Sequence, residues 1–163
     1  MFEAATISSA DPPEFYTDLA RQLEGLLKGE RDAIANAANM SALIFNVVPD
    51  LNWAGFYFRK GTTLVVGPFQ GAPACVRIAL GKGVCGTAAA GRQSLRVDDV
   101  AAFSGHIACD SRSRSELVIP LIRDDRVLGV LDLDSAKPAR FSAWDQQGFE
   151  RLAAIYLADS DLV

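Results

Sequence analysis

The segment SELVIPLIRDDRVLGVLDLDS, residues 115–135, decides the fold class. Its two halves are rich in β-branched and large apolar residues, and the charged turn RDDR separates them, which is typical of an antiparallel hairpin. Four upstream segments have the same character: NWAGFYF (52–58), TLVVGPF (63–69), ACVRIAL (74–80) and SLRVDDV (94–100). We therefore expect a six-stranded, mainly antiparallel sheet.

Helical patterns lie on both sides of these strands. Residues 11–29 open with two prolines and end at a glycine, and a second helix is predicted from about 30 to 48, so that 11–48 forms two N-terminal helices. Helical spacing in the second helix places four residues on its inner face: Ile34, Ala37, Ser41 and Ile44. A C-terminal helix is predicted over 142–158, with Ser142 as its N-cap.

This order of elements predicts an α+β fold, with a central antiparallel sheet and the N- and C-terminal helices packed on one face. The sheet and its pocket loops occupy 52–134, and the whole chain, 1–163, is expected to form one domain. Between the third and fourth strands, GKGVCGTAAAG (81–91) reads as a glycine-rich entry into a short helix. A ligand pocket is then expected under loops on the free face of the sheet.

Composition restricts the class of protein. Half of the 163 residues are hydrophobic, the net charge is −4 and no basic cluster stands out, which argues against nucleic acid or an anionic membrane as a partner. No apolar run approaches the roughly 20 residues of a membrane helix, and the N-terminus lacks a signal-peptide pattern. We therefore expect a soluble, cytoplasmic protein, in which an odd number of cysteines argues against a structural disulfide framework.

The strand NWAGFYF separates its side chains onto two faces. Ala54, Phe56 and Phe58 share the face expected to join the core, whereas Trp53 and Tyr57 point to the other face, on either side of a glycine. Two aromatic rings with a space between them could form the floor of a ligand pocket. The alternative is that both rings are simply half-buried aromatics.

Three carboxylates are expected to gather at the end of the hairpin. Asp132 and Asp134 share a strand face about 7 Å apart. A three-residue turn would place Glu116 opposite one of them, whereas a two- or four-residue turn would set it against leucine, and we favour the register that gathers the acids. Such a cluster could hold a metal ion, could keep one carboxyl protonated as a proton donor, or could be three solvated acids.

The three thiols are Cys75, Cys85 and Cys109. No C-x-x-C pair is present, and the pair of His106 and Cys109 is weak evidence for a metal, so no metal site is predicted. Cys75 and Cys85 could be small buried hydrophobes, although Cys85 also stands at a helix entry that favours anions. Cys109 lies in the polar run GHIACDSRSRSE, where Arg112 and Arg114 could stabilise a thiolate.

Four stretches together resemble the free methionine-R-sulfoxide reductases, small enzymes built on a GAF domain. They are NWAGFYF, VGPFQGAPACVRIALGKGVCGTAA, DDVAAFSGHIACDSRSRSELVIPL and GVLDLDS. The resemblance runs in order from about residue 50 to the last helix. It implies reduction of free L-methionine (R)-S-oxide to L-methionine through a sulfenic acid and an intramolecular disulfide, with thioredoxin as the external reductant. It further implies a homodimer and no bound cofactor.

The same resemblance implies a role for each thiol. The cysteine of GHIACD, Cys109, corresponds to the nucleophile, and the cysteine of PACVRI, Cys75, corresponds to the main resolving thiol. Cys85 in GKGVCG corresponds to a pocket thiol that can also resolve, and it remains the alternative nucleophile.

The acids and aromatics fall on family positions as well. Glu116, Asp132 and Asp134 correspond to the acidic trio of the family, and Trp53 and Tyr57 to its pocket aromatics. An acid on the sulfoxide oxygen is chemically required, because that oxygen leaves only when it is protonated. The rival interpretations are a GAF domain that only senses a small ligand and a thiol redox switch without a substrate.

Overall fold

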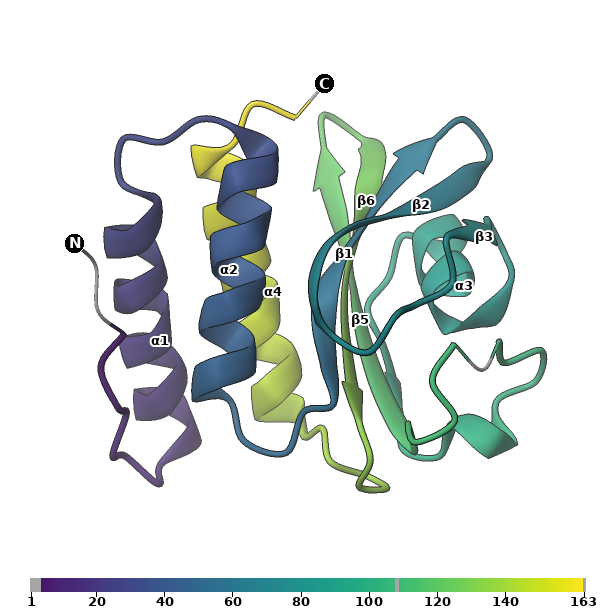
Figure 1. The fold of residues 1–163 in the computed structure, drawn as a ribbon, viewed down its shortest axis with the longest axis horizontal. Helices are drawn as coiled ribbons and strands as arrows, with labels where there is room; N and C mark the ends of the chain where they lie inside the picture. Colours follow the sequence, from purple (N-terminus) through teal and green to yellow (C-terminus); the bar gives the residue numbers. More distant parts are fainter. Residues whose placement is uncertain (1–3, 108, 163) are drawn as a thin grey trace.

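Two layers of helices cover one face of a sheet in the computed structural model, which describes residues 4–107 and 109–162. Helix α1 (Pro12–Leu27) forms an outer layer, and α2 (Ala33–Val47) and α4 (Ala143–Asp159) lie between it and the sheet (Figure 1). The short helix α3 (Gly83–Gly91) lies on the opposite face of the sheet. Within the described part of the chain, every helix is too short or too polar to cross a membrane.

The sheet has the order β3-β2-β1-β6-β5-β4, and its paired neighbours are antiparallel. Its strands are β1 (Trp53–Lys60), β2 (Thr63–Gly71), β3 (Arg77–Ala79), β4 (Leu95–Val97), β5 (Ser115–Arg123) and β6 (Arg126–Ser135). A 3₁₀ turn, η1 (Val100–Ala102), follows β4. The predicted α+β class and helix-covered face are confirmed, although the two edge strands are shorter than the sequence suggested.

The hairpin between β5 and β6 reaches the predicted register by a different route. Its turn has two residues, not three, because Asp124 (φ 48°) and Asp125 (φ 63°) both adopt the left-handed conformation of a type I′ turn. A bulge beside Leu121 then adds one residue on β6 and shifts the pairing. As a result Glu116 faces Asp134, one of the two aspartates expected opposite it, but the predicted turn length is wrong.

The main core lies between the helices and the sheet. Ala54 and Phe56 of β1 are fully buried there, as the alternation of that strand predicted. One predicted inner residue of α2 is wrong: Ile34 is 56% exposed. The buried face of α2 is centred near Met40, and Ile34 lies about 120° around the helix from it, at six residues' separation.

A second hydrophobic cluster covers the other face of the sheet. It packs α3 against the strands and includes Trp53, Tyr57, Val84, Cys85 and Val118. The glycine-rich entry at Lys82–Gly83 lets α3 begin close to the sheet, and Cys85 consequently lies inside this cluster with 3% exposure. The sheet is therefore covered on both faces, and a cavity borders the second hydrophobic cluster.

A close contact between α1 and α4 gives a test of the packing. A Cβ on Gly148 would lie 2.2 Å from ring carbons of Tyr16, whose hydroxyl donates a 2.6 Å hydrogen bond to Asp145 Oδ1. We expect Gly148→Ala to lower the free energy of unfolding by about 1–3 kcal/mol, because forced overpacking outweighs the gain of about 1 kcal/mol in helix propensity. Urea denaturation measures this change.

Gly91→Ala is the control, because Gly91 is also a helical glycine, the last residue of α3, and a Cβ there would meet nothing within 4 Å. Its unfolding free energy is expected to stay within about 0.5 kcal/mol of the wild-type value. Equal effects of the two substitutions would contradict the packing argument.

Candidate active site

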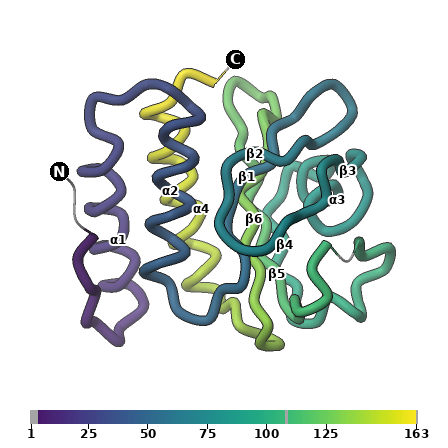
Figure 2. Tube along the Cα trace, in the orientation of Figure 1, coloured from purple at the N-terminus to yellow at the C-terminus, as the bar shows by residue number. Residues whose placement is uncertain are grey.

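The candidate site is a cavity on the α3 side of the sheet, beneath two loops. One loop, residues 72–76, joins β2 to β3, and the other, residues 98–114, joins β4 to β5 (Figure 2). Seven of the predicted site residues line the cavity: Trp53, Tyr57, Cys85, Cys109, Glu116, Asp132 and Asp134. The eighth, Cys75, is bonded to Cys109.

Strand register brings the acids and one aromatic into a single row. Glu116 of β5 pairs with Asp134 of β6, and Asp134 pairs in turn with Trp53 of β1. Asp132 lies two residues along β6, opposite Gly55, on the same face. The three carboxylates therefore meet because the hairpin register and the strand alternation act together.

The expected open space between the two aromatic rings is not present. Trp53 stacks on Tyr57 with ring centroids 5.8 Å apart and on Phe69 with centroids 5.2 Å apart. A Cβ on Gly55 would lie 2.3 Å from the Phe69 Cβ, so the glycine is needed to let that ring approach. The aromatic residues form one continuous wall of the cavity.

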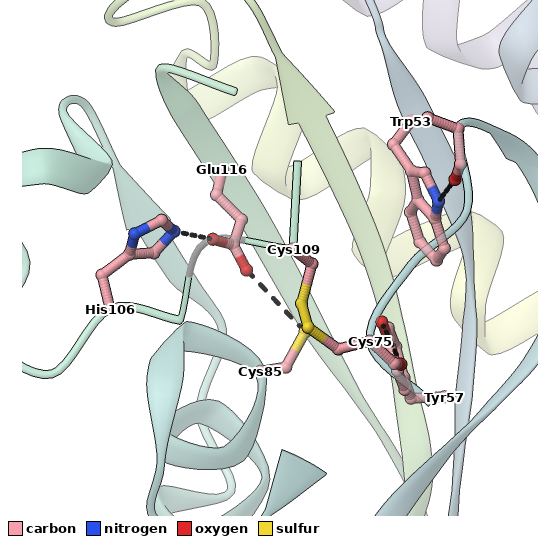
Figure 3. The surroundings of a disulfide bond; sticks show 8 residues. Trp53, Tyr57, Cys75, Cys85, His106, Cys109 and Glu116 are labelled. Atoms are coloured by element: carbon pink, nitrogen blue, oxygen red, sulfur yellow. Dashed lines mark hydrogen bonds and ion pairs between the residues drawn. A yellow bond between two sulfur atoms is a disulfide. The ribbon is translucent and has the colours of Figure 1, made fainter. Parts of the chain in front are cut away.

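The same two aromatics hold the loop that carries Cys75. The indole Nε1 of Trp53 donates to the carbonyl of Ala72 at 3.2 Å, and the hydroxyl of Tyr57 donates to the carbonyl of Cys75 at 3.1 Å (Figure 3). Both donors are on β1 and both acceptors are on the loop. The aromatics thus position a thiol, a role that the sequence analysis did not assign to them.

A disulfide joins the two loops above the cavity. The sulfurs of Cys75 and Cys109 are bonded, with 5.3 Å between the Cα atoms and 34 residues of sequence separation. Both residues are half-buried, so the bond lies near the surface. With the loops tied together, the cavity measures about 30 Å³, which suits about one water molecule and is too small for an amino acid.

Cys85 is the free thiol of the chain and lies against the carboxyl group of Glu116 (Figure 3). Its Sγ donates to Glu116 Oε1 at 3.7 Å. Burial, followed by the charges of Asp132 and Glu116, raises the pKa of the Cys85 thiol well above its ordinary value. Cys85 therefore keeps its proton near neutral pH.

The acidic trio also retains a proton at neutral pH. Burial raises the pKa of Glu116 well above its ordinary value, and repulsion from Asp132 and Asp134 raises it further. The pKa of Asp134 is raised by burial and then by the charge of Asp132, and burial raises the pKa of Asp132 to about 6. Because charges this close cannot all form at once, the cluster can donate a proton inside the cavity.

The loop that carries Cys109 is anchored by polar residues that the sequence analysis did not select. Asn52 Nδ2 donates to Asp110 Oδ2 at 3.1 Å and to Ser113 Oγ at 3.0 Å. Arg112, expected to stabilise a Cys109 thiolate, instead pairs with Asp110 at 2.8 Å, and its hydrogen bonds lower the pKa of Asp110 to about 2. The polar run around Cys109 was the sequence signal for these loop contacts. The partner of Asp110, Asn52, could not be found from it because the two residues are 58 positions apart.

Cys85 also belongs to a group of side chains that could hold a metal ion. Its Sγ and one carboxylate oxygen each of Glu116 and Asp132 lie within 4.8 Å of one another, and all three residues are buried. His106 Nε2 lies 3.9 Å from Glu116 Oε2, and burial lowers the pKa of the imidazole, which favours its neutral form. A thiol and two carboxylates thus lie together, and the imidazole lies beside the second oxygen of Glu116.

Comparison with known proteins relates this chain to an enzyme family. The profile of the GAF domain matches residues 11–156. The free methionine-R-sulfoxide reductase of Escherichia coli is 52% identical over 141 residues, covering 86% of both chains. The Saccharomyces cerevisiae enzyme of the same name is 40% identical over 156 residues, covering 91% of this chain and 87% of that one. The X-ray structure of the Neisseria meningitidis enzyme in complex with its substrate has a TM-score of 0.93 at 40% identity, covering 98% and 95%.

Proposed function

Because this chain belongs to the GAF-domain family of free methionine-R-sulfoxide reductases, we propose that its cavity reduces free L-methionine (R)-S-oxide to L-methionine. The observation that carries the proposal is the Cys75–Cys109 disulfide above a cluster of buried acids. A thiol that can be oxidised and a proton source then lie at the same cavity, as sulfoxide reduction requires.

The reaction divides into two balanced steps. In the first, the Cys109 thiolate attacks the sulfoxide sulfur while the acidic trio protonates the oxygen. The hydroxyl then passes from the substrate sulfur to the Cys109 sulfur, the transient bond between the two sulfurs breaks, and methionine leaves with Cys109 as a sulfenic acid. In the second, the Cys75 thiol attacks the Cys109 sulfur, the S–S bond forms and water departs. Thiols of the chain supply both electrons, so the proposal includes no bound cofactor.

Two observations favour Cys109 over Cys85 as the nucleophile. Cys109 is half-buried and already bonded to a second thiol, which is the product state of the reaction. Cys85 is buried against the acids, which raise its pKa and keep it as the less reactive thiol. We assign Cys85 to contact with the Glu116 carboxyl, where its proton supports the acid cluster.

An external dithiol is needed to open the cavity for the next substrate. The bonded loops leave about 30 Å³, so the disulfide must be reduced before a second sulfoxide can enter. We propose thioredoxin as that reductant and a reducing cytoplasm as the site of turnover. We also propose a homodimer, as the family resemblance implies, and light scattering of the purified chain tests it.

The Cys75→Ser variant separates the reduction of the sulfoxide from the later reduction of the enzyme. A prereduced Cys75→Ser variant is expected to release up to one equivalent of methionine without any reductant, because the first step needs only Cys109 and the acids. Sustained turnover with thioredoxin should fall strongly, because the sulfenic acid has lost its main resolving thiol. Chromatography of released methionine measures both; a ligand sensor or a redox switch without a substrate would release none.

Selectivity for the free amino acid follows from the enclosed site. Buried acids can accept the ammonium of the substrate, whereas a peptide would bring an uncharged amide and a chain that the walls of the cavity exclude. We expect methionine sulfoxide within a peptide to be reduced at least about a hundredfold more slowly than the free R diastereomer. Comparable rates for the two substrates would contradict this explanation of selectivity.

A further inference from the structure

We propose that Cys85, Glu116 and Asp132 bind a divalent cation of the zinc class, and that the bound cation inhibits the enzyme. The binding claim stands on the geometry of these three residues alone. The inhibition claim rests on the proposed function, because it assumes that the acids supply a proton to the substrate.

The distances between the ligand atoms suit a zinc-sized ion. Bond lengths of about 2.3 Å to sulfur and about 2.0 Å to oxygen place the ligand atoms of a tetrahedral site roughly 3.5 Å apart. Cys85 Sγ lies 3.7 Å from Glu116 Oε1, and all three ligand atoms lie within 4.8 Å of one another. Small side-chain rotations would therefore complete the site without moving the backbone.

An unpaired carboxylate oxygen is a second, independent observation that favours a cation site. Asp132 is only 6% exposed, and its Oδ1 atom is buried without a hydrogen-bond partner. Among the described residues that line the cavity, none is a lysine or an arginine. Buried carboxylates left without a donor or a positive charge are costly, and a cation at this point would stabilise them.

The mixture of ligands selects the class of cation. A thiolate is a poor ligand for magnesium or calcium, which prefer oxygen, and a good one for zinc, cobalt or cadmium. His106 lies on the loop above, with Nε2 3.9 Å from Glu116 Oε2, and is outside the group of three ligand atoms. A cation would also displace the proton of the Cys85 thiol, as coordination by thiolate requires.

The site persists in the oxidised chain. Cys85 remains a free thiol when Cys75 and Cys109 are bonded. A cation held there would occupy the small cavity and replace the proton that the acids share. Substrate entry and proton donation would then both be blocked.

Cobalt(II) is the spectroscopic probe for the binding claim. The oxidised full-length chain, with its Cys75–Cys109 disulfide intact, is titrated with Co²⁺, and we expect a thiolate-to-cobalt charge-transfer band that zinc abolishes by displacement. Because Cys85 is the free thiol in this form, Cys85→Ser should lose the band. Asp132→Asn should weaken binding at least about tenfold with the band retained at saturation, whereas Asp161→Asn, at an exposed acid remote from the site, should bind as the wild type does.

Absence of the band in the wild type, or its persistence in Cys85→Ser, would overturn the proposed site. Circular dichroism of each variant confirms that it is folded.

Inhibition is measured on prereduced enzyme freed of small thiols, as methionine released with and without Zn²⁺. Release should fall at least about tenfold at saturating zinc and return on chelation. Binding without inhibition would overturn the inhibitory role, and failure of the metal-free enzyme to release methionine would overturn the proposed function and leave the metal site standing.

Discussion

Cys109→Ser is expected to abolish methionine release, leaving roughly one thousandth or less of the wild-type rate. A serine hydroxyl does not ionise near neutral pH, so it cannot attack the sulfoxide sulfur or form the disulfide with Cys75. The substitution changes one atom at a half-buried position, and the Asn52, Asp110 and Ser113 hydrogen bonds that anchor the loop remain. The loss should therefore be chemical rather than structural.

The assay is methionine released from prereduced protein without any external reductant. Cys85→Ser is the matched control, since it removes the other candidate nucleophile and keeps Cys109. We expect it to release methionine, because its thiol contacts Glu116 and does not form the disulfide with Cys75. Normal release by Cys109→Ser together with none by Cys85→Ser would assign the nucleophile to Cys85.

Asp132→Asn is expected to lower the rate of methionine release about 10²- to 10⁴-fold and, at the same time, to stabilise the fold near neutral pH. The loss of rate follows because the asparagine removes a carboxyl from the cluster that shares the proton. The gain in stability follows because Asp132 is buried with an unpaired oxygen. Asparagine has nearly the same shape and carries no charge to bury.

The pH dependence of that gain has a definite sign. The folded-state pKa of Asp132, about 6, lies above its ordinary value of 3.8, so the folded chain holds this proton more tightly than the unfolded chain does. Wild-type stability is then lost as the pH rises from about 4 through 6, and the full cost applies above that range. The advantage of Asp132→Asn should be on the order of 1–3 kcal/mol at pH 7 and should disappear below about pH 4.

Urea denaturation of both proteins at several pH values measures this difference. Asp161→Asn serves as the control, because Asp161 is exposed at the end of the chain and should change neither the rate nor the pH dependence. An Asp132→Asn variant that is inactive but less stable than the wild type at pH 7 would contradict the claim that the buried carboxylate of Asp132 lowers the stability of the fold while it supports proton donation.

The sequence predicted the parts of the site that depend on strand geometry. Alternation along β1 placed Trp53 and Tyr57 on the face opposite to the core, and alternation along β6 placed Asp132 and Asp134 together. The pairing of Glu116 with one of these two aspartates was predicted from a wrong turn length. A two-residue type I′ turn followed by a bulge pairs the same residues as a three-residue turn would. A bulge has no clear sequence signal, so the two cases could not be told apart.

The parts that could not be predicted depend on contacts between distant segments. The disulfide bridges loops 34 residues apart, and its pairing was indicated by family resemblance rather than by any local pattern. Two further sets of contacts depend on how the loops pack against the sheet. They are the hydrogen bonds from Trp53 and Tyr57 to loop carbonyls and the ion pair between Arg112 and Asp110. Periodicity describes faces of helices and strands, whereas loop contacts of this kind are fixed only in three dimensions.

The most direct test is a single-turnover reaction of the fully reduced wild-type chain with both diastereomers of free methionine sulfoxide and no reductant. We expect one equivalent of methionine, consumption of the R diastereomer alone, and a new disulfide that mass spectrometry of alkylated peptides maps to Cys75 and Cys109, with Cys85 free. Methionine released without loss of these two thiols, or equal consumption of the S diastereomer, would contradict the proposed mechanism.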